Sequence, residues 1–392
     1  MDINISQPSN DNDNDNDNDH DNDNDNEVKS NPKFLKKSLI FVTDWHPNIL
    51  SSTTIGKKNN GAVMYIGPDS LALIQHFPQS ILTDICDKIQ KSVFKNKTIQ
   101  ILDFCSGSGV QAIVILTMLE QICQTITTPI SLKVKANCFD VNERALRFIR
   151  FNSILNGFEK NDISIQIQKM DLLDENDKQT VIEKYKNSSQ MILANPPFIP
   201  VPSIASNDSR NNKTSESIYK RYGLFSSGGN DGEDVLREII MLAPLLLNSK
   251  TGGFLGIVSE FMNPSKSSEI VYKMKQWWKK RAPFHSKGIV KGLLFTNEFP
   301  VDTATYASRR SNDEFEYKVW YEHLNNLDIE TISPGLLFVQ MKDFDTNPNN
   351  KEIHLELEHL LVPRSELGSI WTPHNKYAVE FTKHKWKELN SS

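Results

Sequence analysis

The sequence predicts an α/β protein with a mainly parallel, seven-stranded sheet and helices on both faces. The first observation is that strand-like and helix-like segments alternate after Asn96. Strands separated by helices form βαβ units, which build parallel sheets. The second observation is a glycine-containing turn directly after the first of these strands. The third is that no apolar run approaches the roughly 20 residues that a membrane span needs, so we expect no contact with a membrane.

The expected strands share short apolar, β-branched or aromatic character. They cover residues 98–104, 132–139, 163–169, 190–194, 252–259, 288–295 and 335–342. The expected helices cover 109–124, 142–156, 233–248 and 264–280. Residues 298–333, with a charged middle, indicate an insertion before the last core strand.

The residues before the first core strand predict a short, β-containing extension. The segments 38–43 (SLIFVT) and 62–66 (AVMYI) have the composition of short strands. A helix is expected from Pro68 to about Lys91, and Pro78 should kink it or split it in two.

These observations divide the chain into five parts. They are a disordered Asp/Asn-rich tail (1–30), an N-terminal extension that covers a ligand site (31–94), a catalytic core (95–297), the insertion (298–333), and the last core strand with a C-terminal tail (334–392).

The acidic tail hides the charge of the globular part. The chain carries a net charge of −5, but residues 1–27 contain ten acidic residues and no Lys or Arg. The rest has 39 acidic against 44 basic residues, a net charge of +5. This mildly basic balance permits a nucleic-acid or an acidic protein partner and demands neither.

The four cysteines form no pattern of a disulfide framework or a zinc site, because no C-x-x-C pair or His-rich cluster accompanies them. The first residues lack the basic and apolar regions of a secretory signal. We therefore expect a soluble protein of the cytosol or the nucleus, with no metal in its site.

The glycine-containing turn follows the strand 98–104 and reads DFCSGSGVQA. Gly107 and Gly109 let the backbone turn tightly and approach a ligand, and Ala112 lets the next helix pack closely on the sheet. This pattern suits a dinucleotide and a nucleoside equally well.

Two carboxylates favour a nucleoside that carries positive charge. Asp103 would repel a pyrophosphate at the helix N-terminus, but it suits an ammonium or a sulfonium group. Asp140, at the tip of the second strand, is placed to accept hydrogen bonds from ribose hydroxyls; alternatively it caps the following helix. Asp171 is placed to accept from an adenine amino group, or it is a surface residue of a turn.

The sequence ANPPF follows the fourth strand. Two prolines cannot continue a strand, so they fix a stiff corner between Asn195 and Phe198. An ordinary turn with a core Phe is the alternative.

Taken in order, DFCSGSGVQAI, FDVNERAL, MDLLD and NPPF resemble the motifs of S-adenosylmethionine-dependent methyltransferases with a Rossmann-like seven-stranded sheet. NPPF resembles the amino-methyltransferases in particular: the HemK-type glutamine methyltransferases and the adenine and guanine N-methyltransferases. The resemblance covers about residues 60–265. It implies a site for S-adenosylmethionine at the residues that match these motifs: Asp103, Ser106, Gly107, Gly109, Asp140, Asn142, Asp171 and Asn195.

The same resemblance implies that ANPPF holds a planar NH₂ group for methylation. Such a nitrogen is a poor nucleophile and must be held in line with the sulfonium methyl group. The Asn195 side-chain oxygen and the Pro196 carbonyl would each accept one N–H, Pro197 would fix that carbonyl outward, and Phe198 would stack on the target.

Three further segments are candidates for the site. Asp69 is expected either in a cover over the cofactor or as a helix N-cap. Residues 225–234 resemble the glycine- and acid-containing segment that follows NPPF in these enzymes. The basic loop 199–224, which includes Arg210, Lys213 and Arg221, is a candidate substrate lid.

The chain departs from HemK-type enzymes in lacking room for their N-terminal helical domain and in having Phe rather than Tyr at 198. The substrate is therefore left open among a protein glutamine, a nucleic-acid base and a metabolite. One alternative is an inactive scaffold with the methyltransferase fold. A second is a nicotinamide oxidoreductase, although Asp103 and the ANPPF motif argue against it.

Overall fold

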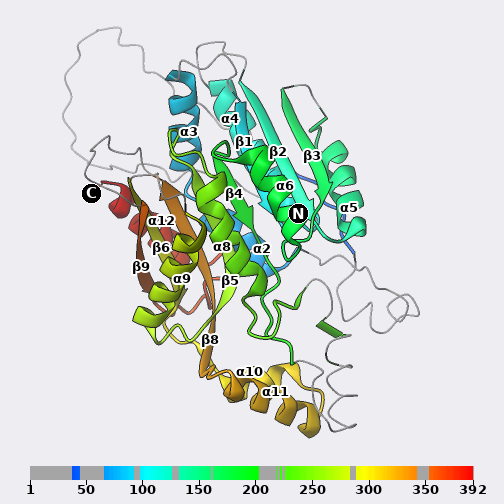
Figure 1. Ribbon diagram of the computed structural model, residues 1–392, viewed down its shortest axis with the longest axis vertical. Coiled ribbons are helices and arrows are strands. Elements are labelled where there is room, and N and C mark those ends of the chain that lie inside the picture. Colours follow the sequence, from blue (N-terminus) through cyan, green and yellow to red (C-terminus); the bar gives the residue numbers. More distant parts are fainter. Residues whose placement is uncertain are drawn as a thin grey trace, which may run out of the picture.

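The computed structural model describes residues 38–44, 66–91, 98–125, 132–159, 162–202, 226–282, 288–341 and 353–391, together with Ile218, Arg221 and Tyr222. One sheet organises the fold, with the strand order β3-β2-β1-β4-β5-β8-β6-β9 and β7 paired to β8 (Figure 1). Its strands are β1 (Thr98–Phe104), β2 (Lys133–Asp140), β3 (Ile163–Lys169), β4 (Met191–Ala194), β5 (Phe254–Met262), β6 (Gly288–Asn297), β7 (Val301–Asp302), β8 (Thr331–Met341) and β9 (Ile353–Val362).

The sheet is mainly parallel. Pairs β1–β2, β1–β4, β2–β3, β4–β5 and β6–β9 are parallel, whereas β8 runs antiparallel to both β5 and β6. All seven strands expected from the sequence are present, and the α/β fold class is confirmed. The difference lies in the count, because β7 and β9 extend the sheet to nine strands.

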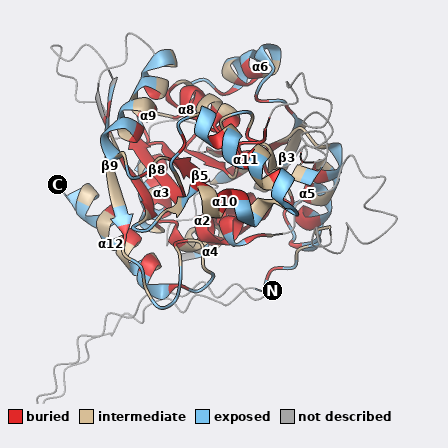
Figure 2. Cartoon of the chain, turned by 90° about the horizontal axis from the view of Figure 1, so that it is seen from below, coloured by how far each residue is buried: buried red, intermediate tan, exposed pale blue. Residues whose placement is uncertain are grey.

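Helices cover both faces of the sheet, and the buried residues form the layer between them (Figure 2). One face packs against α2 (Pro68–His76), α3 (Ser80–Lys91), α4 (Val110–Thr125), α5 (Glu143–Leu155) and α12 (Lys376–Ser391). The other packs against α6 (Glu175–Tyr185), α8 (Asp234–Leu246) and α9 (Ser267–Arg281). The chain changes faces between α5 and α6, so adjacent strands β1 and β4 lead into helices on opposite sides.

Pro78 splits the expected helix 68–91 in two, since α2 ends at His76 and α3 begins at Ser80. The missing N–H of proline explains the break. Helix α6 was not expected. It begins at an N-cap, Asp174, whose side chain accepts hydrogen bonds from the backbone N–H groups of Asn176 and Asp177.

The prediction of a strand at 38–43 is wrong, and the reason is visible in its hydrogen bonds. Residues 38–44 pair with the side-chain amides of Asn152 in α5 and of Asn156 at its C-cap rather than with a strand. Asn156 accepts from Ile40 N (3.0 Å) and donates to Ile40 O (2.8 Å). Asn152 does the same with Val42 (2.8 and 3.0 Å). The alternation expected of a strand is kept, with Leu39 buried and Ile40 exposed. Residues 62–65 of the second expected strand lie outside the described residues.

The insertion 298–333 forms a small helical unit beyond the end of β8 (Figure 1). It contains β7, α10 (Thr303–Arg310) and α11 (Glu314–Asn326). Tyr306 and Trp320 pack there with Ile199 and Met262 in a core separate from those beside the sheet. The insertion thus lies at the edge of the sheet where the parallel strands end.

No helix in the described ranges is both long and apolar enough to cross a membrane.

Asn152 joins three segments and gives a test of this fold. Its side chain is fully buried and also donates to Ser108 O in the turn after β1 (2.9 Å). We expect Asn152→Ala to lower the free energy of unfolding by about 1–3 kcal/mol, because it leaves buried backbone groups without partners. Urea unfolding measures this, with the exposed Asn326→Ala as control; equal stabilities of the two variants would contradict it.

Candidate functional site

The turn between β1 and α4 adopts a backbone conformation that favours glycine at three positions. Cys105, Gly107 and Gly109 have φ angles of +55°, +54° and +81°. Ser106 closes the turn, since its N–H donates to Phe139 O (3.1 Å) and its hydroxyl to Asp103 O (2.5 Å). Gly109 also lies against α5, where a Cβ would be 3.2 Å from the Ile149 side chain. The turn therefore needs its glycines both for conformation and for packing.

Asp103 lies behind this turn and is fully buried. Its Oδ2 accepts from Ala112 N in the first turn of α4 (3.3 Å). Its Oδ1 has no hydrogen-bond partner among the described residues. Burial raises the pKa of Asp103 to about 8, with the Asp140 carboxylate adding to the effect. An unpartnered carboxyl oxygen at this point fits a cationic group nearby, which would lower that pKa again.

Asp140, at the end of β2, holds the turn from the other side. Its Oδ2 accepts from Gly107 N and its Oδ1 from Asn142 N, both at 2.9 Å. Each oxygen keeps a further lone pair for a hydroxyl donor. Burial raises the pKa of this carboxyl. Asp140 does not cap α5; Asn142 does, by accepting from Arg144 N (3.0 Å).

Asp171 follows β3, separated from it by Met170. It is exposed in a turn, where its Oδ1 accepts from Leu173 N (2.9 Å). It also lines the same pocket as Asp140.

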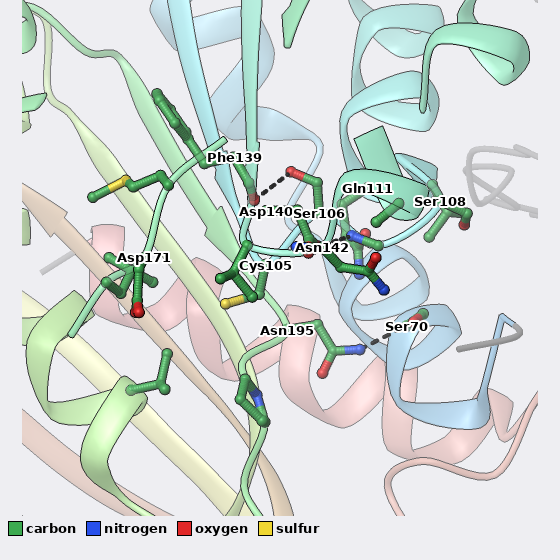
Figure 3. A pocket seen from close by; sticks show the side chains of 18 of the residues that line it. Ser70, Cys105, Ser106, Ser108, Gln111, Phe139, Asp140, Asn142, Asp171 and Asn195 are labelled. Carbon is green, nitrogen blue, oxygen red and sulfur yellow. Dashed lines mark hydrogen bonds between the residues drawn. The ribbon is translucent and has the colours of Figure 1, made fainter. Parts of the chain in front are cut away.

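A pocket of about 370 Å³ opens between these strand ends (Figure 3). Six of the residues expected to bind the cofactor line it: Ser106, Gly107, Asp140, Asn142, Asp171 and Asn195. Of the remaining residues of the ANPPF motif, Pro197 lines it as well. Asp103, Gly109, Pro196 and Phe198 are not part of its wall.

Asn195 leaves β4 toward the pocket, and helix α2 fixes its side chain. The amide nitrogen Nδ2 donates to Asp69 Oδ2 (2.8 Å) and to Ser70 Oγ (3.0 Å). Figure 3 shows this nitrogen directed at Ser70 and the oxygen directed away from α2. Because both N–H groups are engaged, the oxygen Oδ1 is the atom that remains to accept a hydrogen bond.

Asp69 therefore belongs to the site. It is buried, with 3% of its surface exposed, and α2 has Gly67 rather than Asp69 at its N-cap. Burial raises the pKa of Asp69, and Oδ1 of this carboxyl has no partner among the described residues. Neither Asp69 nor Asp103 is part of the pocket wall, but each lies directly behind it: Asp69 holds Asn195, and Asp103 lies behind the glycine turn.

Pro196 and Phe198 pack beside Pro197 and are not themselves part of the pocket wall. Pro196 is buried, and the half-buried Phe198 ring lies 5.4 Å from the ring of Trp371, centroid to centroid. Ile199 then pairs with residues 226–228, accepting from Gly228 N (2.9 Å) and donating to Ser226 O (2.8 Å).

The segment 226–234 packs tightly on this motif. A Cβ at Gly228 would lie 2.8 Å from Phe198 Cα, and one at Gly232 would lie 2.6 Å from Phe198 O. Ser227 and Gly229 line the pocket. The acidic residue Asp234 begins α8. The glycines of this segment therefore allow close packing on the ANPPF motif, whereas the acidic residue lies in the first turn of the helix.

The loop 199–224 is described only in part. Arg210, Lys213 and Lys220 lie outside the described residues. Arg221 forms an ion pair with Glu316 of α11, with Nη2 2.5 Å from Oε1. This cation therefore ties the loop to the insertion.

Several pocket residues were not named individually in the prediction, although Ile66 and Ser70 belong to the extension expected to cover the site. Most of them are apolar or small neighbours of expected residues: Ile66, Cys105, Val110, Phe139, Val141, Ala145, Met170, Leu172, Leu173 and Val235. Ser70, Ser108 and Gln111 add hydroxyl and amide groups. Their adjacency to the acidic and glycine motifs was the only signal in the sequence.

Within the ranges the structure describes, no group of three or more His, Cys, Asp or Glu residues is arranged to hold a metal ion.

No family model and no curated protein matches the chain. Solved structures do match. A predicted O-methyltransferase from Agrobacterium tumefaciens is 11% identical, with 76% of this chain and 96% of that chain covered at a TM-score of 0.33. An arsenic(III) S-adenosylmethionine methyltransferase from Chlamydomonas reinhardtii is 9% identical, with coverages of 68% and 73% and a TM-score of 0.33.

A type I restriction-modification methyltransferase subunit from Streptococcus thermophilus is 13% identical at a TM-score of 0.37. The match covers 86% of this chain but only 55% of that chain. TM-scores and identities this low carry no inference about activity or substrate.

Burial of Asp103 predicts a pH-dependent stability. Its folded pKa lies above its unfolded value, so the folded state holds more protons between about pH 4 and pH 8. The free energy of unfolding should fall across this window as the pH rises, by at most about 1.4 kcal/mol per pH unit from this group. Urea unfolding at several pH values checks this, and Asp103→Asn should flatten the slope. An unchanged slope in the variant would contradict the assignment.

Proposed function

We propose that the chain is an S-adenosylmethionine-dependent N-methyltransferase that acts on a planar sp² nitrogen, either an amide or an exocyclic amino group. The observation that carries the proposal is the side chain of Asn195. Asp69 and Ser70 take its N–H groups (2.8 and 3.0 Å), and its oxygen is left to accept a hydrogen bond at the pocket.

The cofactor is assigned to the part of the pocket beside β1, β2 and β3. The ribose hydroxyls would donate to Asp140, and the adenine would lie between Asp171 and the apolar side chains of Leu172 and Leu173. The ammonium group of the cofactor would lie on the other side of the glycine turn from Asp103, where its positive charge would stabilise the ionised carboxylate. These acceptors and apolar groups suit a cationic nucleoside better than a phosphate-bearing one.

The target nitrogen is assigned to the part beside Asn195 and Pro197. Oδ1 of Asn195 would accept one N–H of the target and Pro196 O the other. Two acceptors orient the nitrogen lone pair toward the methyl group and stabilise the positive charge that develops on nitrogen.

The reaction then needs no metal and no strong base. The nitrogen forms a bond to the methyl carbon while the carbon–sulfur bond breaks, and the sulfonium becomes the neutral thioether of S-adenosylhomocysteine. The methylated nitrogen loses its extra proton to water after transfer. The protein supplies orientation and electrostatic stabilisation only.

Asn195→Ala tests the target half of the site. We expect it to lower methyl transfer by about 100-fold or more, because the variant removes an acceptor for developing charge. The measurement is transfer of labelled methyl from S-adenosylmethionine into an extract of cells lacking this protein, with Asn326→Ala as control. Digestion of the products with nuclease or protease, and separation by size, identifies the substrate class. Equal transfer by Asn195→Ala and the unaltered protein would contradict the role of Asn195.

Asp140→Ala tests the cofactor half. The variant loses acceptors for the ligand and for Gly107 N and Asn142 N. We expect binding of S-adenosylmethionine to weaken by about tenfold or more. Isothermal titration calorimetry measures the affinity, with Asp174→Ala, an N-cap of α6, as the matched control. Affinities that agree between the two variants would refute the assignment.

A further inference from the structure

The C-terminal segment 368–375 lies beside the ANPPF motif although it comes after the last strand of the sheet. Trp371 provides the contact, with its ring 5.4 Å from Phe198 and tilted by 52°. Both rings are half-buried. Phe198 follows Pro197, which lines the pocket. The segment therefore reaches the side of the pocket where the target group is assigned.

The backbone around Trp371 is held by a dense set of hydrogen bonds. Trp371 N donates to Ser369 Oγ (3.2 Å), and Ser369 N donates to Thr372 Oγ1 (2.9 Å). Thr372 N in turn donates to Ser369 O (2.9 Å). Ile370 N donates to Asn297 Oδ1 at the end of β6 (2.9 Å). A turn satisfied to this extent keeps one conformation.

The indole itself is anchored to the sheet. Its Nε1–H donates to Gly335 O in β8 (3.3 Å). Gly335 lies so close to its neighbours that a Cβ would be 2.3 Å from Phe295 O and 2.7 Å from the Phe261 ring. The anchor is thus part of the core, and the orientation of the indole is fixed relative to β5 and β8.

His76 connects this segment to the helix that holds Asn195. Its Nε2 lies 3.0 Å from Ile370 O and its Nδ1 2.7 Å from Thr382 Oγ1 in α12. Burial lowers the pKa of His76 to about 3, so the ring is neutral, and Nε2 carries the proton because Ile370 O only accepts. His76 ends α2, and Asp69 and Ser70, which bind Asn195, lie in its first turn.

The two ends of the ANPPF motif are consequently held by one continuous structure. Helix α2 fixes Asn195, Trp371 packs on Phe198, and His76 joins α2 to the segment that carries Trp371. We infer that Trp371 is a positioning residue that sets the plane of the Phe198 ring against the target group, which rests on the proposed function. Trp371 acts through Phe198 and does not take part in the chemistry.

This role makes Trp371 a residue that helps the site to select planar target groups. A ring held in one plane offers a stacking surface to a planar group, whereas a ring free to rotate does not. Loss of the indole should therefore impair transfer while cofactor binding is retained.

The test compares Trp371→Ala, Trp371→Phe and Trp277→Ala. Trp277 is a matched control, because it is half-buried on α9 under the Arg237 guanidinium (5.4 Å), on the opposite face of the sheet. Methyl transfer into extract and calorimetric binding of S-adenosylmethionine are measured for each variant. We expect Trp371→Ala to lose transfer by about 100-fold with unchanged affinity for the cofactor. Trp371→Phe, which keeps a ring, should restore most of the rate.

A second readout follows the Phe198 ring directly. 4-Fluorophenylalanine placed at position 198 gives one fluorine resonance, whose chemical shift should change with Trp371→Ala and stay constant with Trp277→Ala.

Each outcome decides the inference. The inference would be overturned if Trp371→Ala transferred methyl groups as fast as Trp277→Ala. It would also be overturned if Trp371→Ala lost as much affinity for the cofactor as it lost in transfer rate. Either result would leave the proposed function intact. An unchanged fluorine shift would overturn it as well. Absence of label with the unaltered protein would overturn the proposed function together with it.

Discussion

The crevice between the carboxyl ends of β1 and β4 is the feature around which the candidate site is arranged. These strands are neighbours, yet β1 leads into α4 on one face of the sheet and β4 leads toward α8 on the other. In open parallel sheets such a reversal leaves a space above the strand ends, where ligands bind. The glycine turn lies on one side of this space and Asn195 on the other.

Three buried carboxyls lie at or behind the wall of that space, at a cost in stability. Asp69, Asp103 and Asp140 all have pKa values raised by burial. For Asp69 and Asp103, one oxygen lacks a partner among the described residues. A core selected only for stability would not keep such groups. Asp140 lines the pocket and the other two lie directly behind its wall, and perturbed carboxyls gathered at one cleft are typical of functional sites. A cationic ligand with hydrogen-bond donors would relieve both defects.

The core of the fold could be predicted from the sequence because each βα unit carries its own local pattern. The strands up to β5 and the turn at Gly107 and Gly109 are of this kind, as is the break at Pro78. The strand predicted at 38–43 is absent because the hydrogen-bond partners of this segment are the side chains of Asn152 and Asn156, which no local pattern reveals. In β9, leucines alternate with Glu356 and Glu358. This alternation is the pattern of a half-exposed edge strand, so the sequence does carry a local signal for β9 within the segment predicted as a C-terminal tail.

The site divides in the same way. Asp140 follows β2 and Asn195 follows β4, and both line one pocket, a shared position that the order of the motifs along a parallel sheet is enough to predict. The partners that fix them come from distant parts of the chain: Ser70 and Asp69 from α2, and Trp371 from beyond β9. Such contacts are set by tertiary packing, so a single sequence does not specify them.

The most direct measurement of the central claim is a crystal structure of the protein with S-adenosylhomocysteine. The account predicts the ribose on Asp140 and the sulfur facing Asn195; a ligand bound elsewhere, or turned so that its sulfur points away from Asn195, would contradict it.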